Sequence, residues 1–458
     1  MFRIKACLFS YILIALTPFA ANSQQSSLEQ WMKTEGNIAL TRMNQNISPT
    51  GAARGVVIAS PSRQDPDYYF HWTRDAALVM ETFYLPQTFA DYTEFSRQTQ
   101  LVSTLTGLGE PRFNIDGSAY TGPWARPQND GPALRVLTIL RSLRRPQISS
   151  ATAQATAQTT VQAIVQTDLQ YILNYFRTPS FCLWEEVKGD HFYTRLVQMA
   201  ALKESLEHFD SNWNIPRQTL QTAMTSLQNE LARHWRDDKK YFSATLNRIE
   251  GAENYKFTDL DTAVILAVLH ANLETDEFSV KDDRILATAS QLETAFAATY
   301  EINAPTYASP YPVAPAIGRY TDDIYFGGNP WYITTAAFAE LHYRLSLQLM
   351  KNNSYVVTEL NLPFLKKALA LRGSDSDVAE LQSGLNLKTR PQLVKLLQEG
   401  LLARGDLFMA RLRLHTPVDG SMAEQFARKD GQPVSARDLT WSYASFLSAL
   451  KSRKALFE

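Results

Sequence analysis

The stretch of the sequence with the clearest chemical potential is a pair of adjacent glutamates, Glu185 and Glu186, which directly follows Trp184. The other residues around the pair are mostly apolar, namely Phe181, Leu183 and Val187. Burial among apolar side chains disfavours the ionised form of a carboxyl and raises its pKa. A carboxyl that keeps its proton near neutral pH can act as a general acid, and we expect this of Glu185. The alternative is a surface turn after a helix, and residues 181–187 alone leave both interpretations open.

A second segment combines aromatic and charged residues where a loop runs into a predicted helix over residues 76–83. It contains Tyr68, Trp72, Arg74 and Asp75, and four of the five residues from 68 to 72 are Tyr, Phe or Trp. An acidic residue at a helix start is favoured by the helix dipole, which would explain Asp75 as a structural residue. That explanation does not account for the aromatic cluster beside it, so the segment is also a candidate binding site.

Three further loops have the same unusual composition. Residues 113–132 are rich in Gly and Pro, which exclude a continuous helix, and carry Trp124 among Tyr, Arg, Asn and Gln side chains that can stack on sugar rings and bind hydroxyls. Residues 318–332 carry Arg319 and Trp331, and residues 419–426 carry Glu424. Glu424 lies in a polar Gly-Ser-Met-Ala-Glu-Gln context, where we expect a hydrated, ionised carboxylate. Without the other loops it would be interpreted as an ordinary glutamate at the end of a loop.

The overall composition is that of a large protein with a substantial core. The chain has 458 residues, 45% of them hydrophobic, and a formal net charge of −1. This balance gives no electrostatic reason to expect a nucleic acid or an anionic membrane as a partner. The seven histidines are scattered and no HExxH or CxxC spacing occurs, so we expect neither a metal nor another cofactor.

The N-terminus has the pattern of a secretory signal peptide over residues 1–23. Arg3 and Lys5 precede an apolar run over residues 6–16, and small residues follow. The apolar run is too short to span a bilayer. We therefore expect an exported protein, and its mature chain keeps only Cys182, which cannot form an internal disulfide.

The rest of the chain predicts about a dozen helices and very few strands. Helical periodicity covers residues 27–43, 153–176, 194–208, 217–235, 261–272, 282–299 and 332–350. A final helix is predicted to open with a capping box at Ser435–Asp438, with Trp441 and Tyr443 as core residues. The best strand signal is residues 55–58. Plain loops alternate with elaborate ones, by which we mean the loops described above that carry Trp, Tyr, Arg, Asp and Glu. The sequence contains no linker and no break in composition, so we expect one domain over residues 24–458. If helix pairs close into a ring, the elaborate loops converge at one end.

The elaborate loops resemble the catalytic domain of fungal-type glucoamylases, which are inverting, exo-acting glycoside hydrolases. The matching segments follow the order of that family and extend from about residue 30 to the last helix. They are Ala59-Ser60-Pro61-Ser62, Trp72-Thr73-Arg74-Asp75, Ala119-Tyr120-Thr121-Gly122, Asp130-Gly131-Pro132-Ala133, Leu183-Trp184-Glu185-Glu186, Gly328-Asn329-Pro330-Trp331, Asp419-Gly420-Ser421-Met422 and Ser435-Ala436-Arg437-Asp438. The resemblance implies an all-α fold, an (α/α)6 barrel with the active site in the loops at one end.

The resemblance also implies a role for each matching residue. Glu185 corresponds to the general acid and Glu424 to the general base, whose carboxyls an inverting enzyme holds roughly 6.5–9.5 Å apart. Arg74 and Asp75 correspond to residues that bind the non-reducing-end glucose. The remaining substrate-binding positions are Tyr68, Trp72, Trp124, Leu183, Trp184, Glu186, Arg319 and Trp331. The implied substrates are α-1,4-linked glucans, with slower cleavage of α-1,6 bonds and β-glucose as the product, and the implied assembly is a monomer.

Two features of the chain depart from the family. Cys182 stands three residues before the proposed acid, where relatives usually have an aspartate. A carboxylate there would raise the pKa of the acid by repulsion, so we expect the basic limb of the pH profile to lie at lower pH here. The chain also ends soon after the last predicted helix without a starch-binding module, which favours soluble dextrins over raw granules.

Two other functions fit parts of the pattern. An (α/α)6 hydrolase of another α-glucoside, such as a trehalase, would share the helical pattern and the carboxylates. A non-catalytic glucan-binding protein would need only the cleft, but the presence of both Glu185 and Glu424 together with Arg74 and Asp75 argues against it.

Overall fold

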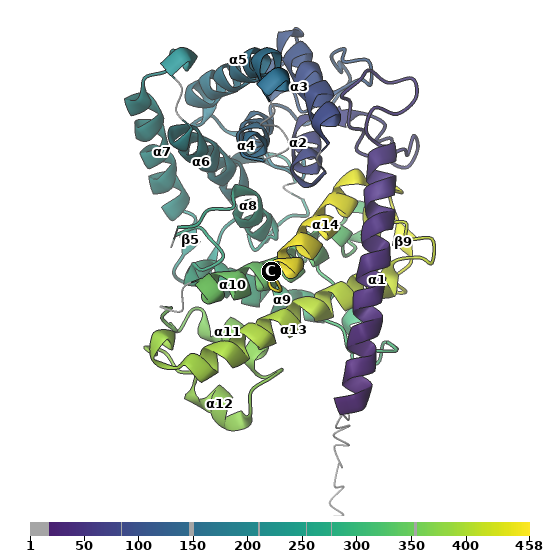
Figure 1. Cartoon of the computed structure of the whole chain (residues 1–458), viewed down its shortest axis with the longest axis vertical. Helices are drawn as coiled ribbons and strands as arrows, with labels where there is room; N and C mark the ends of the chain where they lie inside the picture. The colour runs from purple at the N-terminus through teal and green to yellow at the C-terminus, as the bar shows by residue number, and fades with distance from the viewer. Residues whose placement is uncertain are drawn as a thin grey trace, which may run out of the picture.

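The computed structural model describes residues 18–458 except 84, 146–150, 209–210, 253, 276 and 352–354, with side chains from residue 27 onward except at 151–158 and 211. Residues 1–17 of the predicted signal peptide (residues 1–23) lie outside this described part, which begins at the start of α1 (Pro18–Gln45). Helices dominate the fold, and the strands are short (Figure 1).

Six helices form an inner ring. Each packs against the next, and the last packs against the first, so that the ring is closed. Their order around the ring is α2 (Thr73–Thr82), α4 (Gly131–Leu143), α6 (Phe192–Glu207), α8 (Ala263–Ala271), α10 (Tyr332–Lys351) and α14 (Thr440–Lys454).

The remaining long helices form an outer layer around this ring. They are α1, α3 (Pro86–Leu101), α5 (Ala151–Tyr175), α7 (Arg217–Ala232), α9 (Asp283–Thr299) and α13 (Pro391–His415). Five of them pack on an inner helix: α1 on α14, α5 on α4, α7 on α6, α9 on α8 and α13 on α10, while α3 packs on α5. The short helices α11 (Leu362–Leu369) and α12 (Asp375–Glu380) lie between α10 and α13 in the chain. This arrangement is the predicted (α/α)6 barrel.

The two layers differ in how their sequences distribute apolar residues. The inner helix α8 is apolar around almost its whole circumference, and eight of its nine residues are buried. The outer helix α7 buries only Leu220, Ala223, Leu227 and Leu231, which are spaced by three or four residues and therefore line one face. An inner helix touches neighbours on all sides, whereas an outer helix needs only one apolar stripe.

Short antiparallel strand pairs brace the loops that lead into the inner helices. β1 (His71–Trp72) pairs with β2 (Arg112–Phe113), and β8 (Gln425–Phe426) pairs with β9 (Pro433–Val434). A three-stranded sheet joins β3 (Ser180–Phe181), β4 (Lys188–His191) and β7 (Thr245–Glu250), and β5 (Trp235–Arg236) pairs with β6 (Tyr241–Phe242). The loops are therefore held by backbone hydrogen bonds rather than left free.

Two local predictions from the sequence are wrong. Residues 55–58 form no strand; Val57 and Ile58 make only isolated bridges to Ile47 and His71, between a turn at residues 54–55 and a bend at residue 59. The capping box at Ser435–Asp438 is also absent. Helix α14 starts later, at Thr440, and has no side-chain cap, because both polar side chains of the expected box are used elsewhere.

Candidate functional site

A cavity of about 640 Å³ lies at the end of the barrel where the inner helices begin. All twelve residues predicted for the site line this cavity: Tyr68, Trp72, Arg74, Asp75, Trp124, Leu183, Trp184, Glu185, Glu186, Arg319, Trp331 and Glu424. They come from the first turn of α2 and from the segments that lead into α2, α4, α6, α10 and α14. The segment before α8 also contributes, through Tyr255. Every inner helix therefore starts next to the same space, which places its positive N-terminal end toward the cavity.

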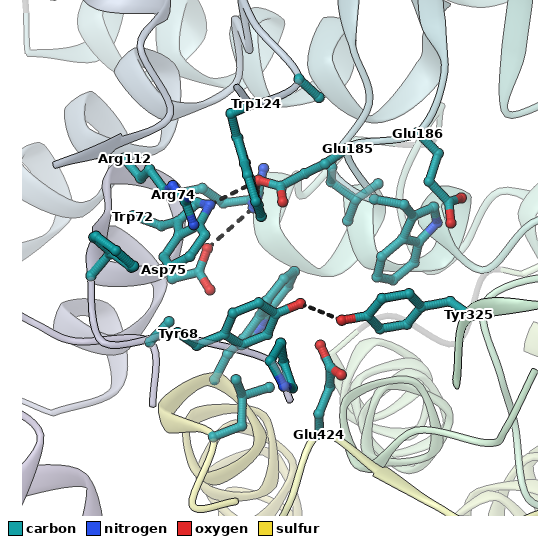
Figure 2. A pocket seen from close by; sticks show the side chains of 18 of the residues that line it. Tyr68, Trp72, Arg74, Asp75, Arg112, Trp124, Glu185, Glu186, Tyr325 and Glu424 are labelled. Carbon is teal, nitrogen blue, oxygen red and sulfur yellow. Dashed lines mark hydrogen bonds and ion pairs between the residues drawn. The ribbon is translucent and has the colours of Figure 1, made fainter. Parts of the chain in front are cut away.

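Glu185 lies in the tight turn between β3 and β4. The turn is closed by hydrogen bonds from the backbone N–H of Cys182 to the carbonyl of Val187, and from the N–H of Glu185 to the carbonyl of Cys182, both 2.9 Å. Glu185 has a φ of +64°, a left-handed conformation that a residue with a Cβ adopts only when its surroundings impose it. Strained backbone of this kind is concentrated at functional sites, and here it points the carboxyl into the cavity (Figure 2).

One oxygen of Glu185 is held by two hydrogen bonds and one ion pair. Oε1 accepts hydrogen bonds from Trp72 Nε1 at 2.8 Å and from Gln128 Nε2 at 3.0 Å, and Arg74 Nη2 lies 3.6 Å away. The setting of Glu185 is therefore more polar than its neighbours in the sequence suggest. Its Oε2 has no hydrogen-bond partner within the described chain and is the oxygen available to a bound molecule.

Glu424 projects from the opposite wall of the cavity, from the segment just before β8 (Figure 2). Its Oε2 accepts hydrogen bonds from Gln425 Nε2 at 3.1 Å and from Ser435 Oγ. Only 3% of Glu424 is exposed, and burial raises its pKa to about 7, against the lowering effects of Ser435, Arg319 and Gln425. The expectation of a well-hydrated carboxylate is therefore wrong, because the polar loop is covered by residues distant in the sequence.

Arg74 and Asp75 form the charged part of the cavity on the α2 side. Arg74 donates from Nη1 to Gln128 Oε1 at 2.8 Å and pairs with Asp130 at 3.1 Å, while its Nε lies 3.3 Å from Asp75 Oδ2. Burial raises the pKa of Asp75 to about 6, although the neighbouring Arg74 opposes this shift. Gln128 contacts both Arg74 and Glu185 and so fixes their relative positions.

Glu186 and Arg319 form a second charged group. Arg319 Nη2 binds Glu186 Oε1 at 2.7 Å and the same guanidinium binds Asp323 at 2.6 Å, while the Tyr320 hydroxyl donates to Glu186 Oε2 at 2.8 Å. The adjacent Trp184 is fixed from behind, because its Nε1 donates to Asp261 Oδ1 at 2.9 Å. These side chains are thus held rigidly beside Glu185.

Aromatic side chains make up much of the remaining lining. Trp72 contacts Tyr68 and Trp124 edge-on, with ring centroids 5.4 and 5.9 Å apart. The hydroxyls of Tyr68 and Tyr325 lie 2.8 Å apart and face the carboxyl of Glu424 (Figure 2). The indole nitrogens of Trp124 and Trp331 are buried and have no hydrogen-bond partner within the described residues. The walls therefore present flat ring surfaces on which a sugar can pack.

Several lining residues were not predicted. Trp441 was expected to be core, but it lines the cavity and its ring lies 5.9 Å from the guanidinium of Arg74; Tyr443 is buried in the core as expected. Arg112 lies 3.5 Å from the ring of Trp124. No local motif marks Arg112, which reaches the cavity only through the pairing of β1 with β2. Two residues that bind the carboxyls were also not predicted: Gln128, which binds Glu185, and Ser435, which binds Glu424. The loop motif around Trp124 was the available signal for Gln128, whereas Ser435 was predicted to cap a helix.

The described residues offer neither a metal-binding cluster nor a membrane-spanning helix. No group of three or more His, Cys, Asp or Glu side chains in the described part of the chain is placed to hold a metal ion. None of its helices combines the length and the apolar character that crossing a bilayer requires.

Comparison with known proteins gives a consistent set of matches. Residues 36–451 match the family described as Glycosyl hydrolases family 15. The chain is 34% identical to a protein named Glucoamylase from Blastobotrys adeninivorans, with 96% of this chain and 74% of that protein covered. It is also 34% identical to Glucoamylase 1 of Rhizopus oryzae, with 93% and 71% covered.

Solved structures give the same result for the fold. The Glycoside Hydrolase Family 15 glucoamylase from Hypocrea jecorina superposes with a TM-score of 0.83 at 31% identity, covering 94% of this chain and 73% of that one. The glucoamylase from Saccharomycopsis fibuligera superposes with a TM-score of 0.82 at 28% identity, covering 94% and 96%. The similarity extends over the whole barrel and not only over the loops.

Proposed function

The chain belongs to glycosyl hydrolase family 15 and its activity is that of a glucoamylase, and on this premise we propose how its cavity releases glucose. The substrates are α-1,4-linked glucans such as starch, glycogen and maltodextrins, attacked at their non-reducing ends, with slower cleavage at α-1,6 bonds. Glu185 is the general acid, Glu424 is the general base, and the product is β-glucose.

One observation carries the assignment of the two carboxyls. Glu185 and Glu424 line the same cavity from opposite walls, and each has one oxygen tied to protein donors. The remaining oxygen of each is available to a bound molecule. This is the arrangement required when one carboxyl protonates the leaving oxygen and the other activates a water on the far side of the sugar.

The chemistry follows from this geometry. Glu185 transfers its proton from Oε2 to the glycosidic oxygen as the bond to the anomeric carbon breaks. Glu424 in its ionised form removes a proton from water, whose oxygen forms the new bond at the opposite face. A single displacement of this kind inverts the configuration, so an α-linked sugar leaves as β-glucose.

The other lining residues position the sugars. Arg74 and Asp75 bind hydroxyls of the terminal glucose, which restricts cleavage to chain ends. Tyr68, Trp72 and Trp124 surround the cleaved residue, where electron-rich ring faces favour developing positive charge. Leu183, Trp184, Glu186, Arg319 and Trp331 contact the next sugar. The pairs Arg74–Asp130 and Arg319–Asp323 hold both cations in place before substrate arrives.

The test is maltopentaose hydrolysis followed by proton NMR at early times, with the parent, Glu185→Gln and Glu424→Gln. We expect β-glucose as the first product of the parent and loss of its release in both variants. α-Glucose as the first product would mean a retaining mechanism and would remove the water-activating role of Glu424. Cleavage of trehalose but not of maltopentaose would assign the cavity to a different α-glucoside.

Export and assembly form a separate part of the proposal. The N-terminal pattern supports removal of residues 1–23 and export of the mature chain, and the resemblance to the family implies a monomer. One relative, from Saccharomyces cerevisiae and 29% identical, is named an intracellular, sporulation-specific glucoamylase, so family membership alone does not decide location. N-terminal sequencing of protein recovered outside the producing cells, with sedimentation analysis, tests both points; a chain retained inside the cells with residues 1–23 intact would overturn the first.

A further inference from the structure

Three large apolar side chains lie exposed beside the cavity, and we call them the rim patch: Phe257, Ile324 and Phe326. Their exposed fractions are 75%, 60% and 44%. Single exposed apolar residues need no explanation, but several on joined loops next to a binding site indicate a surface that binds a ligand or a partner. Phe326 itself lines the cavity, so the rim patch continues its wall outward.

A row of aromatic rings connects the rim patch with the interior of the cavity. Trp184 contacts Trp331 with ring centroids 5.5 Å apart, Trp331 contacts Tyr325 at 6.3 Å, and Tyr325 contacts Phe326 at 4.8 Å. The row begins beside Glu186, where we place the second sugar, and ends at the surface. Tyr255, half-buried in the cavity lining, comes from the segment that also carries Phe257.

The two loops that carry the rim patch are bound to each other and to the site. Asp322 Oδ2 accepts hydrogen bonds from the backbone N–H of Phe257 at 2.5 Å and of Thr258 at 3.0 Å. The next residue, Asp323, binds Arg319 inside the cavity. The three apolar side chains are therefore presented by two joined loops, one of which is anchored at the substrate-binding arginine.

Phe326 occupies a strained position at the tip of its loop. Its φ is +51°, a left-handed conformation that is costly for a large side chain. The amide of Asn329 holds it there by donating to its carbonyl at 2.7 Å. A glycine or asparagine would fit this backbone without strain, so the loop keeps a phenylalanine at the edge of the cavity where local conformation disfavours it.

From this continuity we infer that the rim patch binds the glucan chain beyond its second sugar. The inference rests on the proposed function, since the same chain enters the cavity at its non-reducing end. The apolar faces of successive glucose rings pack on Phe326 and then on Ile324 and Phe257, as sugar rings do on aromatic and aliphatic side chains. The patch thereby makes the enzyme prefer long maltodextrins over maltose.

The experiment compares kcat/KM for maltoheptaose with that for maltose. The variants are Phe257→Ser combined with Ile324→Ser, and separately Phe326→Asn, which suits the left-handed backbone. We expect the maltoheptaose-to-maltose ratio to fall by roughly five- to tenfold in each, the size expected from losing aromatic packing. The matched control is Phe457→Ser, because Phe457 is 63% exposed but follows the far end of α14.

The outcomes separate this inference from the proposed function. A parent that releases no glucose from either substrate contradicts the proposed function itself. An active parent whose ratio is unchanged by the rim substitutions overturns the rim patch as a glucan surface. The alternative is that the rim patch binds a second copy of the chain, and sedimentation velocity on the same proteins tests it. If the parent is a dimer, the rim substitutions dissociate it and the maltoheptaose-to-maltose ratio does not change, the patch is a contact between two copies of the chain.

Discussion

The two carboxyls of the cavity are held in contrasting ways. Glu185 lies in a run of apolar residues, yet its Oε1 meets a cation and two neutral donors, Arg74, Trp72 and Gln128. Glu424 lies in a polar loop, yet it is almost fully buried and its hydrogen bonds come from the neutral side chains of Ser435 and Gln425. The residues that set each environment come from other loops, so the local sequence describes neither environment correctly.

This contrast explains how two glutamates can divide one reaction. The carboxyl that must deliver a proton is oriented through one oxygen and leaves the other free. The carboxyl that must accept a proton is shielded from solvent, which raises its pKa to about 7 and makes its ionised form a stronger base. Substitutions at and around the two carboxyls test this division, and the largest effect is expected at the carboxyls themselves.

The largest effect separates the acid from the base by the choice of leaving group. Fluoride leaves without a proton, so α-glucosyl fluoride bypasses the need for a general acid. We expect Glu185→Gln to lower kcat on maltose by about 10²–10⁴-fold, the usual contribution of one proton transfer, but to spare most turnover of the fluoride. Glu424→Gln should lower kcat on maltose and kcat on α-glucosyl fluoride alike. Equal losses on the two substrates in both variants would contradict the assigned roles.

A second effect concerns Glu35, which lies behind the loop that carries Glu424. Glu35 is buried, one of its oxygens has no partner within the described chain, and burial raises its pKa to about 7, with Arg42 opposing and Asp419 adding to the shift. A carboxyl with a raised folded-state pKa stabilises the fold fully below its unfolded pKa. This stability is lost as the pH rises through about 7.

We therefore expect Glu35→Gln to stabilise the protein at pH 8 relative to the parent. The gain should be at most about 3.5 kcal/mol, since the pKa of Glu35 lies about 2.5 above its ordinary value of 4.5 and one pKa unit corresponds to about 1.4 kcal/mol. Little difference should remain at pH 4. Thermal melts across this pH range measure it, with the exposed Glu399→Gln on α13 as the control. An identical pH dependence in parent and variant would show that Glu35 does not titrate in this way.

A smaller effect should follow from Ser435→Ala. The Ser435 hydroxyl donates to Glu424 and lowers its pKa, so its removal raises that pKa further. The acidic limb of kcat/KM against pH should move to higher pH by about one unit, which is about tenfold in rate on that limb. Ser421→Ala in the same loop is the control, because Ser421 binds Asp419 instead. A uniform loss at all pH values would indicate a structural effect.

The smallest effect concerns the Glu185 side, through Cys182→Asp. Cys182 is buried behind the turn that carries Glu185, and burial raises the pKa of its thiol while Lys256 lowers it. A carboxylate here would repel charge on Glu185 and move the basic limb to higher pH, but Lys256 should reduce the shift to less than about one unit. Cys182→Ser controls for the loss of the thiol. An unmoved basic limb in the aspartate variant would refute the effect.

The loops could be recognised from the sequence because the reaction needs particular side chains in continuous motifs. Two motifs keep the candidate substrate-binding residues next to one another in the chain: Trp72-Thr73-Arg74-Asp75 and Leu183-Trp184-Glu185-Glu186. Once one residue of such a motif is recognised, its neighbours are identified with it. The inner helices could also be predicted from the sequence where apolar residues surround the whole helix, as in α8. These features depend on residues that are close in the chain.

The sequence by itself therefore indicated the helical class, five elaborate loops and the twelve candidate residues that line the cavity. Only the tertiary structure decided that Glu424 is buried, that Ser435 binds it instead of capping α14, and that Arg112 and Trp441 line the cavity. Each of these depends on contacts between segments far apart in the chain. Solvent exposure and hydrogen-bond partners are properties of packed surfaces, and no local pattern of residues contains them until the ring of helices closes.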